Sequence, residues 1–144
     1  MLIGVPREIK TREFRVGLVP SSVAELVHRG HEVLIETQAG VGIGATDEGY
    51  RAVGATIAEN AADVFTKADM VVKVKEPQPN EWVQLSSNQI LFTYLHLAAD
   101  APQAYGLVDS GCTAIAYETI TDDAGGLPLL APMSEVAGRL AVIE

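Results

Sequence analysis

The stretch VVKVKEP (residues 71–77) decides the fold, because its valines predict a buried strand and its proline prevents a central strand from continuing. A second apolar run, ILFTYLHLAA (residues 90–99), repeats the pattern about twenty residues later. Near-continuous apolar strands are typical of a parallel sheet that is covered on both faces. Both runs also hold basic side chains, Lys73 and Lys75 in the first and His96 in the second.

The rest of the chain alternates strand and helix patterns. Further strands are predicted over residues 2–5, 31–36 and 113–118. Helices are predicted over residues 20–29, 61–68, 80–85, 100–108 and 134–144, and another short helix begins at residue 46. This alternation indicates βαβ units. We therefore predict an α/β fold with an open, mostly parallel sheet and helices on both faces, Rossmann-like or flavodoxin-like.

The pattern changes near residue 130. Gly125, Gly126 and Pro128 punctuate this segment, and Ser134 is a plausible N-cap for a final helical pattern that has no stop signal. We assign residues 1–130 to one domain and residues 131–144 to the start of a helix that leads onward. A helical pattern without a stop indicates a native chain that continues beyond residue 144.

Composition excludes several classes of protein. The chain has 144 residues, of which 48% are hydrophobic, so it can form a sizeable core and disorder is not expected. Its net charge of −9 argues against a nucleic-acid footprint, and no apolar run is long enough to cross a membrane. The N-terminus does not have the order of a signal peptide. One cysteine fits a reducing cytoplasm.

Lys75 and His96 are candidates for one site. Ligands of open α/β sheets bind beyond the carboxyl ends of the strands, where both residues are expected. If the two strands are neighbours, the side chains converge on one crevice, and strand periodicity also places Lys73 on the same face as Lys75. Taken singly, each has a simpler reading, a solvated lysine and a hydrogen-bonded core histidine. Together they are interpreted as floor residues of a site.

Three other features leave alternatives open. Arg15, within REIKTREFRVGLVP (residues 7–20), could grip a carboxylate, although such a charge cluster is usually a solvated loop. AGVGIGA (residues 39–45) has the spacing G-x-G-x-G, so a flexible loop is preferred over a dinucleotide fingerprint. Cys112 is interpreted as inert packing. LLAPMSEVAG (residues 129–138) could receive an anion or ribose at a helix start, or be a simple interdomain turn.

Four segments together resemble the alanine dehydrogenase family. They are GVPREIKTREFRVGLVP, VVKVKEP, LFTYLHLAA and YET followed by LPLLAPMSEVAGRLA, in the family's order and spacing and across essentially the whole chain. The related alpha subunit of proton-translocating transhydrogenase shares the first motif and the fold. It lacks a histidine at the position of His96, which favours the amino-acid dehydrogenase.

The resemblance implies a reaction and roles for residues. L-alanine, NAD and water would give pyruvate, ammonium and NADH. Arg15 would bind the substrate carboxylate, Lys75 would hydrogen-bond the pyruvate oxygen, and His96 would be the general acid/base. Met133 would lie near the substrate and Ser134 near the cofactor.

The resemblance also implies an assembly and a missing part. Glu118 would help to shape the cleft, and family members are generally hexamers. The family's NAD-binding domain comes after the last residue of this sequence, so residues 1–130 would be the first segment of the substrate domain. Such a chain would bind pyruvate without transferring hydride. The alternative is a non-catalytic ligand-binding or assembly domain of the transhydrogenase alpha-subunit type.

Overall fold

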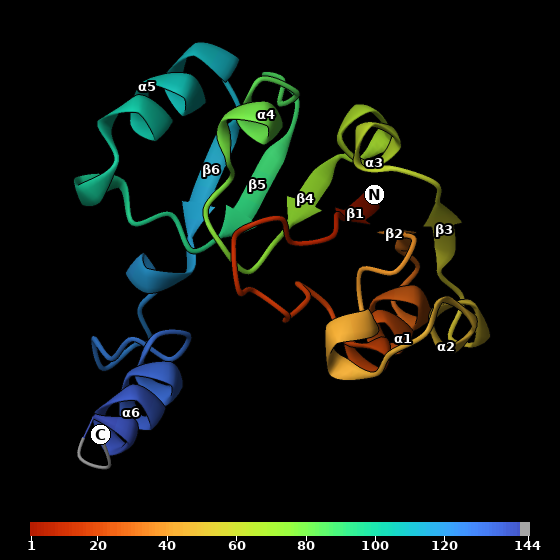
Figure 1. The fold of residues 1–144 in the computed structure, drawn as a ribbon, viewed down its shortest axis with the longest axis horizontal. Coiled ribbons are helices and arrows are strands. Elements are labelled where there is room, and N and C mark those ends of the chain that lie inside the picture. The colour runs from red at the N-terminus through yellow and green to blue at the C-terminus, as the bar shows by residue number, and fades with distance from the viewer. Residues whose placement is uncertain (142–144) are drawn as a thin grey trace.

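A single sheet of six parallel strands organises the computed structural model, which describes residues 1–141 (Figure 1). The strands are β1 (Leu2–Val5), β2 (Glu32–Glu36), β3 (Thr56–Ala58), β4 (Met70–Val72), β5 (Ile90–Thr93) and β6 (Thr113–Ala116). Their order is β3-β2-β1-β4-β5-β6, and every neighbouring pair is parallel. The predicted parallel sheet is confirmed. The three-residue β3 was not predicted, since it is too short to give a periodic pattern.

Helices follow the strands at the expected places. They are α1 (Pro20–His28), α2 (Asp47–Ala52), α3 (Ala61–Lys67), α4 (Pro79–Trp82), α5 (Ala101–Ser110) and α6 (Ala131–Leu140). Three of them begin at side-chain caps, because Thr46, Asn60 and Asp100 each accept a hydrogen bond from the backbone N–H three residues on. Three short 3-10 turns complete the set, η1 (Val41–Ile43), η2 (Leu97–Ala99) and η3 (Tyr117–Thr119).

The last helix differs from the prediction at its start. Helix α6 begins at Ala131, so Ser134 lies within it and is not its N-cap. Pro132 explains the earlier start, because proline in the first turn lacks only an N–H that has no partner in the helix. The last three residues of the predicted helix, 142–144, lie outside the described residues.

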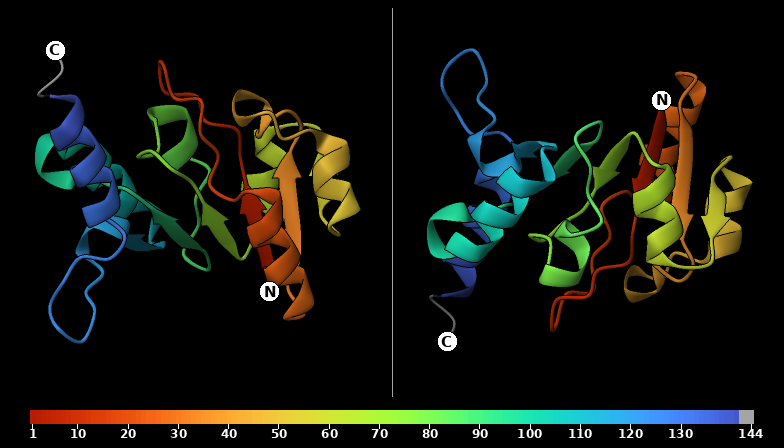
Figure 2. Two further views of the ribbon diagram at one scale, coloured as in Figure 1. Left: turned by 90° about the horizontal axis from the view of Figure 1, so that it is seen from below. Right: turned by 90° about the horizontal axis from the view of Figure 1, so that it is seen from above.

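Helices cover both faces of the sheet, as predicted (Figure 2). On one face, Val5 and Ile35 pack with Val23 of α1 and Tyr50 of α2. On the other, side chains of α3 and α5 pack over the strands. The buried residues of that second layer are Val64, Phe65, Val71, Leu91 and Leu107. Each fully buried side chain of this size contributes about 1.5–3 kcal/mol.

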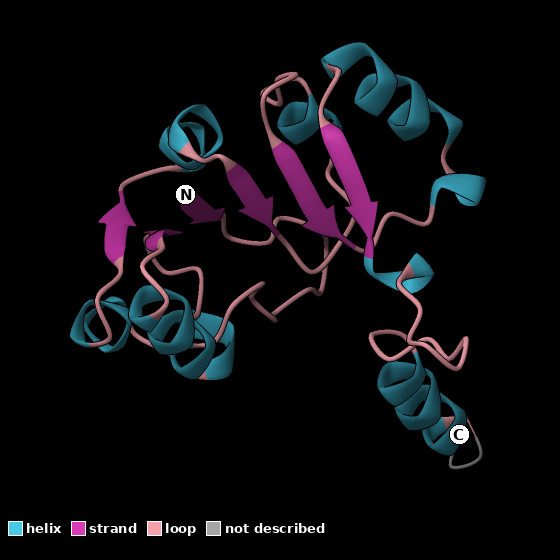
Figure 3. Ribbon diagram, turned by 180° about the vertical axis from the view of Figure 1, so that it is seen from behind, coloured by secondary structure: helices cyan, strands magenta, loops and turns pink. Residues whose placement is uncertain are grey.

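Helix α6 stands apart from the sheet (Figure 3). None of its residues is buried, and the chain reaches it through a loop beyond β6 and η3. In residues 1–141, no helix is both long and apolar enough to cross a membrane.

The strand order creates a crevice between β1 and β4. From β1 the chain winds outward through β2 and β3, and from β4 it winds the other way through β5 and β6. Such a point of reversal leaves an opening at the carboxyl ends of the two central strands, where open α/β sheets bind ligands. The loop after β1 carries Arg15, and Lys75 follows β4.

Candidate functional site

The loop between β1 and α1, residues 6–19, lies directly over the end of β4. A Cβ atom at Gly17 would lie 2.6 Å from the carbonyl oxygen of Val72. Glycine permits this close approach because it has no side chain. The Arg15 segment is therefore held against the strand that precedes Lys75.

A buried ionic cluster fastens the same loop. Lys73 is fully buried, and its Nζ lies 2.7 Å from Oε1 of Glu81 and 3.3 Å from Oε2 of Glu8. Glu8 also accepts a hydrogen bond from the Val74 N–H at 2.6 Å. Burial raises the pKa of the Glu8 carboxyl, while the positive charge of Lys73 opposes that rise. These contacts tie the loop after β1 to β4 and α4.

The prediction that Lys73 belongs to the site floor agrees with its place in the lining of a cavity at this end of the sheet, although its side chain is fully buried. Strand β4 ends at Val72, but the Lys73 N–H still donates to the Phe92 carbonyl of β5, at 3.1 Å. Lys73 is enclosed by carboxylates, whereas Lys75 is partly exposed. Lys73 is therefore a structural cation.

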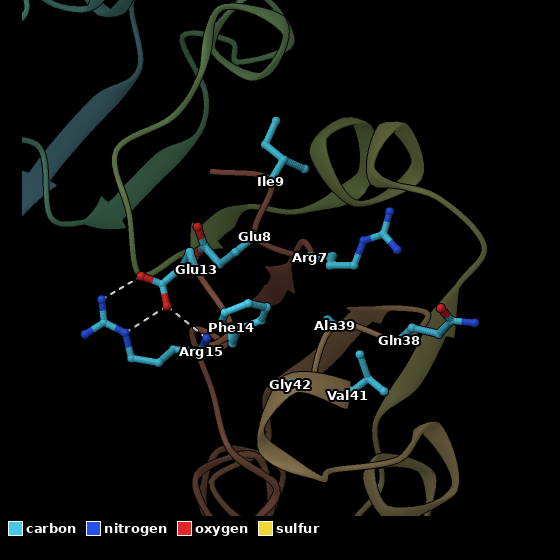
Figure 4. Close-up of a pocket in the computed structure, with 10 residues that line it drawn as sticks. All are labelled: Arg7, Glu8, Ile9, Glu13, Phe14, Arg15, Gln38, Ala39, Val41 and Gly42. Atoms are coloured by element: carbon cyan, nitrogen blue, oxygen red, sulfur yellow. Dashed lines mark hydrogen bonds and ion pairs between the residues drawn. The ribbon is translucent and has the colours of Figure 1, made fainter. Parts of the chain in front are cut away.

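Arg15 is gripped by a carboxylate of its own loop (Figure 4). The Nε and Nη2 atoms of Arg15 lie 2.8 and 2.6 Å from the two carboxylate oxygens of Glu13. The backbone N–H of Arg15 also donates to Glu13 Oε1, at 2.9 Å. Hydrogen bonds from Arg15 lower the pKa of Glu13 to about 2, and the nearby charge of Lys75 acts in the same direction. Glu13 thus lies close to both basic residues that the sequence singled out.

An open cavity lies beside Arg15 at the carboxyl ends of β4 and β5. Its volume is about 480 Å³, and its lining includes Arg15, Phe92, Tyr94, Tyr117 and Met133. Arg15 Nη1 lies 3.6 Å from Met133 Sδ, and the Tyr94 hydroxyl lies 3.2 Å from the same sulfur. The cavity therefore combines apolar walls with one guanidinium, a composition suited to a small organic acid.

His96 lies on the far side of Tyr94. Its ring stacks on the Tyr94 ring with 6.0 Å between centroids, and its side chain is 52% exposed. Its Nδ1 lies 3.6 Å from Oε2 of Glu76, a buried oxygen that has no hydrogen-bond partner among the described residues. Burial acts to raise the pKa of Glu76, but the hydrogen bond from Lys10, a backbone hydrogen bond and the charges of Lys10 and His96 together lower that pKa.

The backbone at His96 is in the left-handed conformation, with φ of 50°. Glu118 supports it, because its carboxylate accepts hydrogen bonds from the N–H groups of Leu95, at 3.0 Å, and His96, at 2.7 Å. Positive φ is uncommon outside glycine and concentrates at functional sites. The expected influence of Glu118 on the cleft is thus accompanied by a direct contact with the His96 backbone.

Only some of the candidate residues line the cavity. Lys75 and His96 follow two adjacent parallel strands, β4 and β5. Arg15 and Met133 line the cavity, whereas Lys75 and His96 are not among its lining residues, and the His96 ring stacks on that of Tyr94. Ser134 is exposed on α6, immediately after Met133, and no described side-chain contact joins it to the site.

Sequence reasoning missed three of the side chains at the site. Glu13 is two residues before Arg15 and could have been noticed as an acidic neighbour in the same loop. Tyr94 is two residues before His96, a spacing that puts side chains on one side of an extended chain. Glu76 gave no signal, since its pairing depends on how the strands are arranged.

A protein-family model described as "Alanine dehydrogenase/PNT, N-terminal domain" matches residues 4–137. The chain belongs to this family. It is 55% identical to an alanine dehydrogenase from Halomonas elongata over 142 residues, which is 99% of this chain and 38% of that relative. The chain thus spans little more than a third of the length of the curated relatives it matches.

Two solved structures are similar to this member of the alanine dehydrogenase/PNT family. An L-alanine dehydrogenase superposes with a TM-score of 0.93 at 55% identity, covering 99% of this chain and 39% of that one. A transhydrogenase from Sinorhizobium meliloti superposes with a TM-score of 0.78 at 26% identity, covering 83% of this chain and 36% of that one. Both contain the same sheet, and the first is far more similar in sequence.

Residues 1–141 do not fit a dinucleotide. The glycines of residues 39–45 form η1, and Gly42 packs so tightly against Phe14 that a Cβ there would overlap its carbonyl oxygen. The backbone of this turn is therefore not free to approach a pyrophosphate. A second cavity beside the Arg15 loop is lined by Arg7, Gln38 and Val41 among others, and Arg15 also contributes to its lining (Figure 4).

Proposed function

We propose that this chain is the substrate-binding part of an NAD-dependent alanine dehydrogenase, which interconverts L-alanine with pyruvate and ammonium. The observation that carries the proposal is a cavity lined by Arg15 and Met133 at the carboxyl ends of β4 and β5, the strands that Lys75 and His96 follow, in a chain 55% identical to an alanine dehydrogenase. The transhydrogenase alternative has weaker support, since that likeness stands at 26% identity.

Arg15 receives the carboxylate of alanine or pyruvate. A guanidinium presents paired donors that match a carboxylate, and the adjoining cavity is large enough for a three-carbon acid. The apolar side chains of Tyr94 and Met133 would face the substrate methyl group. Lys75 would hydrogen-bond the carbonyl oxygen and stabilise the negative charge that develops there.

His96 transfers a proton to or from the oxygen or nitrogen atom that is bonded to the reacting carbon. Hydrolysis of the imine formed from alanine adds water and releases ammonium, and these steps need a group that accepts and returns protons. A histidine with half its side chain exposed is accessible for this exchange. Its contact with Glu76 orients the ring through Nδ1.

NAD would supply the hydride acceptor. Because residues 1–141 do not fit a dinucleotide, we assign its binding to another domain and derive no step through it here. We further propose residues 1–130 as the substrate domain, residues 131–144 as the start of the helix leading onward, and a cytoplasmic homohexamer as the assembly. Met133 would contact substrate, and Ser134 would lie near the cofactor.

Steady-state kinetics of the full-length protein test the proposal. The expected result is NADH formation with L-alanine and NAD, and NADH consumption with pyruvate and ammonium. Glycine and L-serine serve as competing substrates, and NADP as the competing cofactor. Absence of both reactions in a folded full-length protein would refute the proposal.

A further inference from the structure

The contact between Glu13 and Arg15 uses only one edge of the guanidinium. Arginine offers a side edge, formed by Nε and Nη2, and an end edge, formed by Nη1 and Nη2. Glu13 takes the side edge with distances of 2.8 and 2.6 Å. The end edge therefore retains the donors that a second carboxylate can use.

The free edge faces the cavity. Nη1 lies 3.6 Å from Met133 Sδ, and both residues line the 480 Å³ space that Tyr94 shares. A thioether is only a weak acceptor, so this contact leaves the donors of Nη1 available. An incoming carboxylate would replace the sulfur contact without displacing Glu13.

Burial, hydrogen bonds and a nearby positive charge stabilise the Glu13 carboxylate in the position where it binds Arg15. Its side chain is only 7% exposed, whereas that of Arg15 is 44% exposed. Glu13 accepts three hydrogen bonds from Arg15, two from the guanidinium and one from the backbone. The charge of Lys75 also acts on Glu13, in the direction that keeps its carboxylate ionised.

We propose that Glu13 is a positioning residue that holds Arg15 by its side edge and aims the end edge at the substrate carboxylate. This inference rests on the proposed function and names a residue that controls how the substrate is gripped. In the alternative arrangement Glu13 competes with substrate, because it occupies the guanidinium donors of Arg15 that the substrate carboxylate must use. The two arrangements predict opposite changes in affinity when Glu13 is removed.

The experiment compares Glu13→Ala and Glu13→Gln with wild type in the full-length protein. Calorimetric titration with pyruvate measures the Kd, and steady-state kinetics with L-alanine measure KM and kcat. For Glu13→Ala we expect a Kd and KM about tenfold higher, equivalent to roughly 1.4 kcal/mol of binding free energy. The kcat at saturating alanine should stay within about threefold of wild type, because Arg15 binds a group that is charged throughout the reaction.

Glu13→Gln keeps one acceptor oxygen and should fall between wild type and Glu13→Ala. Glu25→Ala is the matched control, because it removes the carboxylate of another glutamate–arginine pair, Glu25 and Arg29, on the exposed surface of α1. It should leave Kd, KM and kcat unchanged. Thermal unfolding of each variant verifies that the compared proteins are folded.

Tighter pyruvate binding in Glu13→Ala would overturn the inference in favour of competition, and unchanged Kd and KM would also overturn it. Failure of the proposed function is distinguishable, because wild type would then produce no NADH. In that case titration with pyruvate and acetate as carboxylate probes still decides the role of Glu13. Loss of carboxylate binding in Arg15→Ala but not in Glu13→Ala would likewise count against positioning.

Discussion

At the scale of single residues, His96 combines a left-handed backbone conformation with the proposed role of general acid/base. Its left-handed φ of 50° is tolerated better by asparagine than by most side chains, so His96→Asn preserves the backbone while removing the imidazole. We expect kcat for alanine oxidation to fall by about 10²–10⁴-fold, the usual contribution of a general acid/base. Thermal unfolding should be unchanged because the side chain is half exposed. A near-normal kcat in His96→Asn would remove His96 from the mechanism.

Arg15 should act on binding more than on turnover. Its proposed partner is the substrate carboxylate, which is present in both substrate and transition state, so Arg15→Ala should raise KM for alanine and pyruvate while kcat at saturation changes less. Arg15→Lys should rescue poorly, since one ammonium cannot hold Glu13 and a substrate carboxylate through two edges. Initial rates over a wide range of alanine concentrations give both parameters. Equal losses of kcat in the two variants would contradict the assignment.

The residues of the site could be predicted only where chain position was informative. Arg15 lies in a loop that follows a strand, and His96 and Lys75 end apolar runs, so the rule for ligand positions in α/β sheets points to them. Lys73 has the same local pattern as Lys75 but a different role. Two carboxylates determine that difference, Glu81 on the next helix and Glu8 far away in the sequence, and no local pattern reveals their contact with Lys73.

At the scale of elements, the Lys73 cluster joins the loop after β1 to β4 and α4. Lys73→Met should destabilise the protein by about 3–5 kcal/mol, because it leaves Glu8 and Glu81 buried without a counter-charge. Lys67→Met is the control, since it breaks an exposed pair with Asp63, worth at most about 1 kcal/mol. Urea unfolding at pH 7 measures both changes. A loss below 1 kcal/mol for Lys73→Met would show that the cluster does not fasten the loop.

The pH dependence of Lys73→Met follows from the same burial. The pKa of Glu8 is already raised above its ordinary 4.5 by burial, and loss of Lys73 removes a charge that opposes the rise. The folded variant then binds more protons than the unfolded chain above pH 4.5, so its stability falls as pH increases through that region. We expect the deficit relative to wild type to be small near pH 4 and to grow toward pH 7. A deficit that shrinks with rising pH would contradict this account.

The presence of the helices and strands could be predicted better than the residues at which they begin and end. Apolar runs gave five of the six strands, and Thr46, Asn60 and Asp100 marked three helix starts. The apolar run that predicted β4 extends past Val72, the last residue of the strand, and there the Val74 N–H donates to Glu8. Such a long-range contact has no signature in the local pattern.

At the scale of the whole molecule, strand order creates the site. Alternating strands and helices are compatible with more than one doubly wound order, so the sequence alone did not distinguish a Rossmann-like from a flavodoxin-like sheet. The observed order makes β1 and β4 neighbours and brings the Arg15 loop onto the end of β4. That neighbourhood, more than any motif, explains how Arg15 lines one cavity with Val74, which lies far from it in the sequence.

The same architecture predicts that substrate binding and turnover can be separated. The cavity beside Arg15 lies within residues 1–141, whereas no glycine-rich turn in that part of the chain fits a dinucleotide. If thermal unfolding shows that the purified 144-residue chain is folded, the chain should therefore bind pyruvate weakly and form no NADH from alanine. Calorimetry with pyruvate and an absorbance assay for NADH measure the two properties, with Arg15→Ala as the control for binding. NADH formation above the level measured for His96→Asn would contradict this prediction, because NAD would then have to bind to residues that do not fit a dinucleotide.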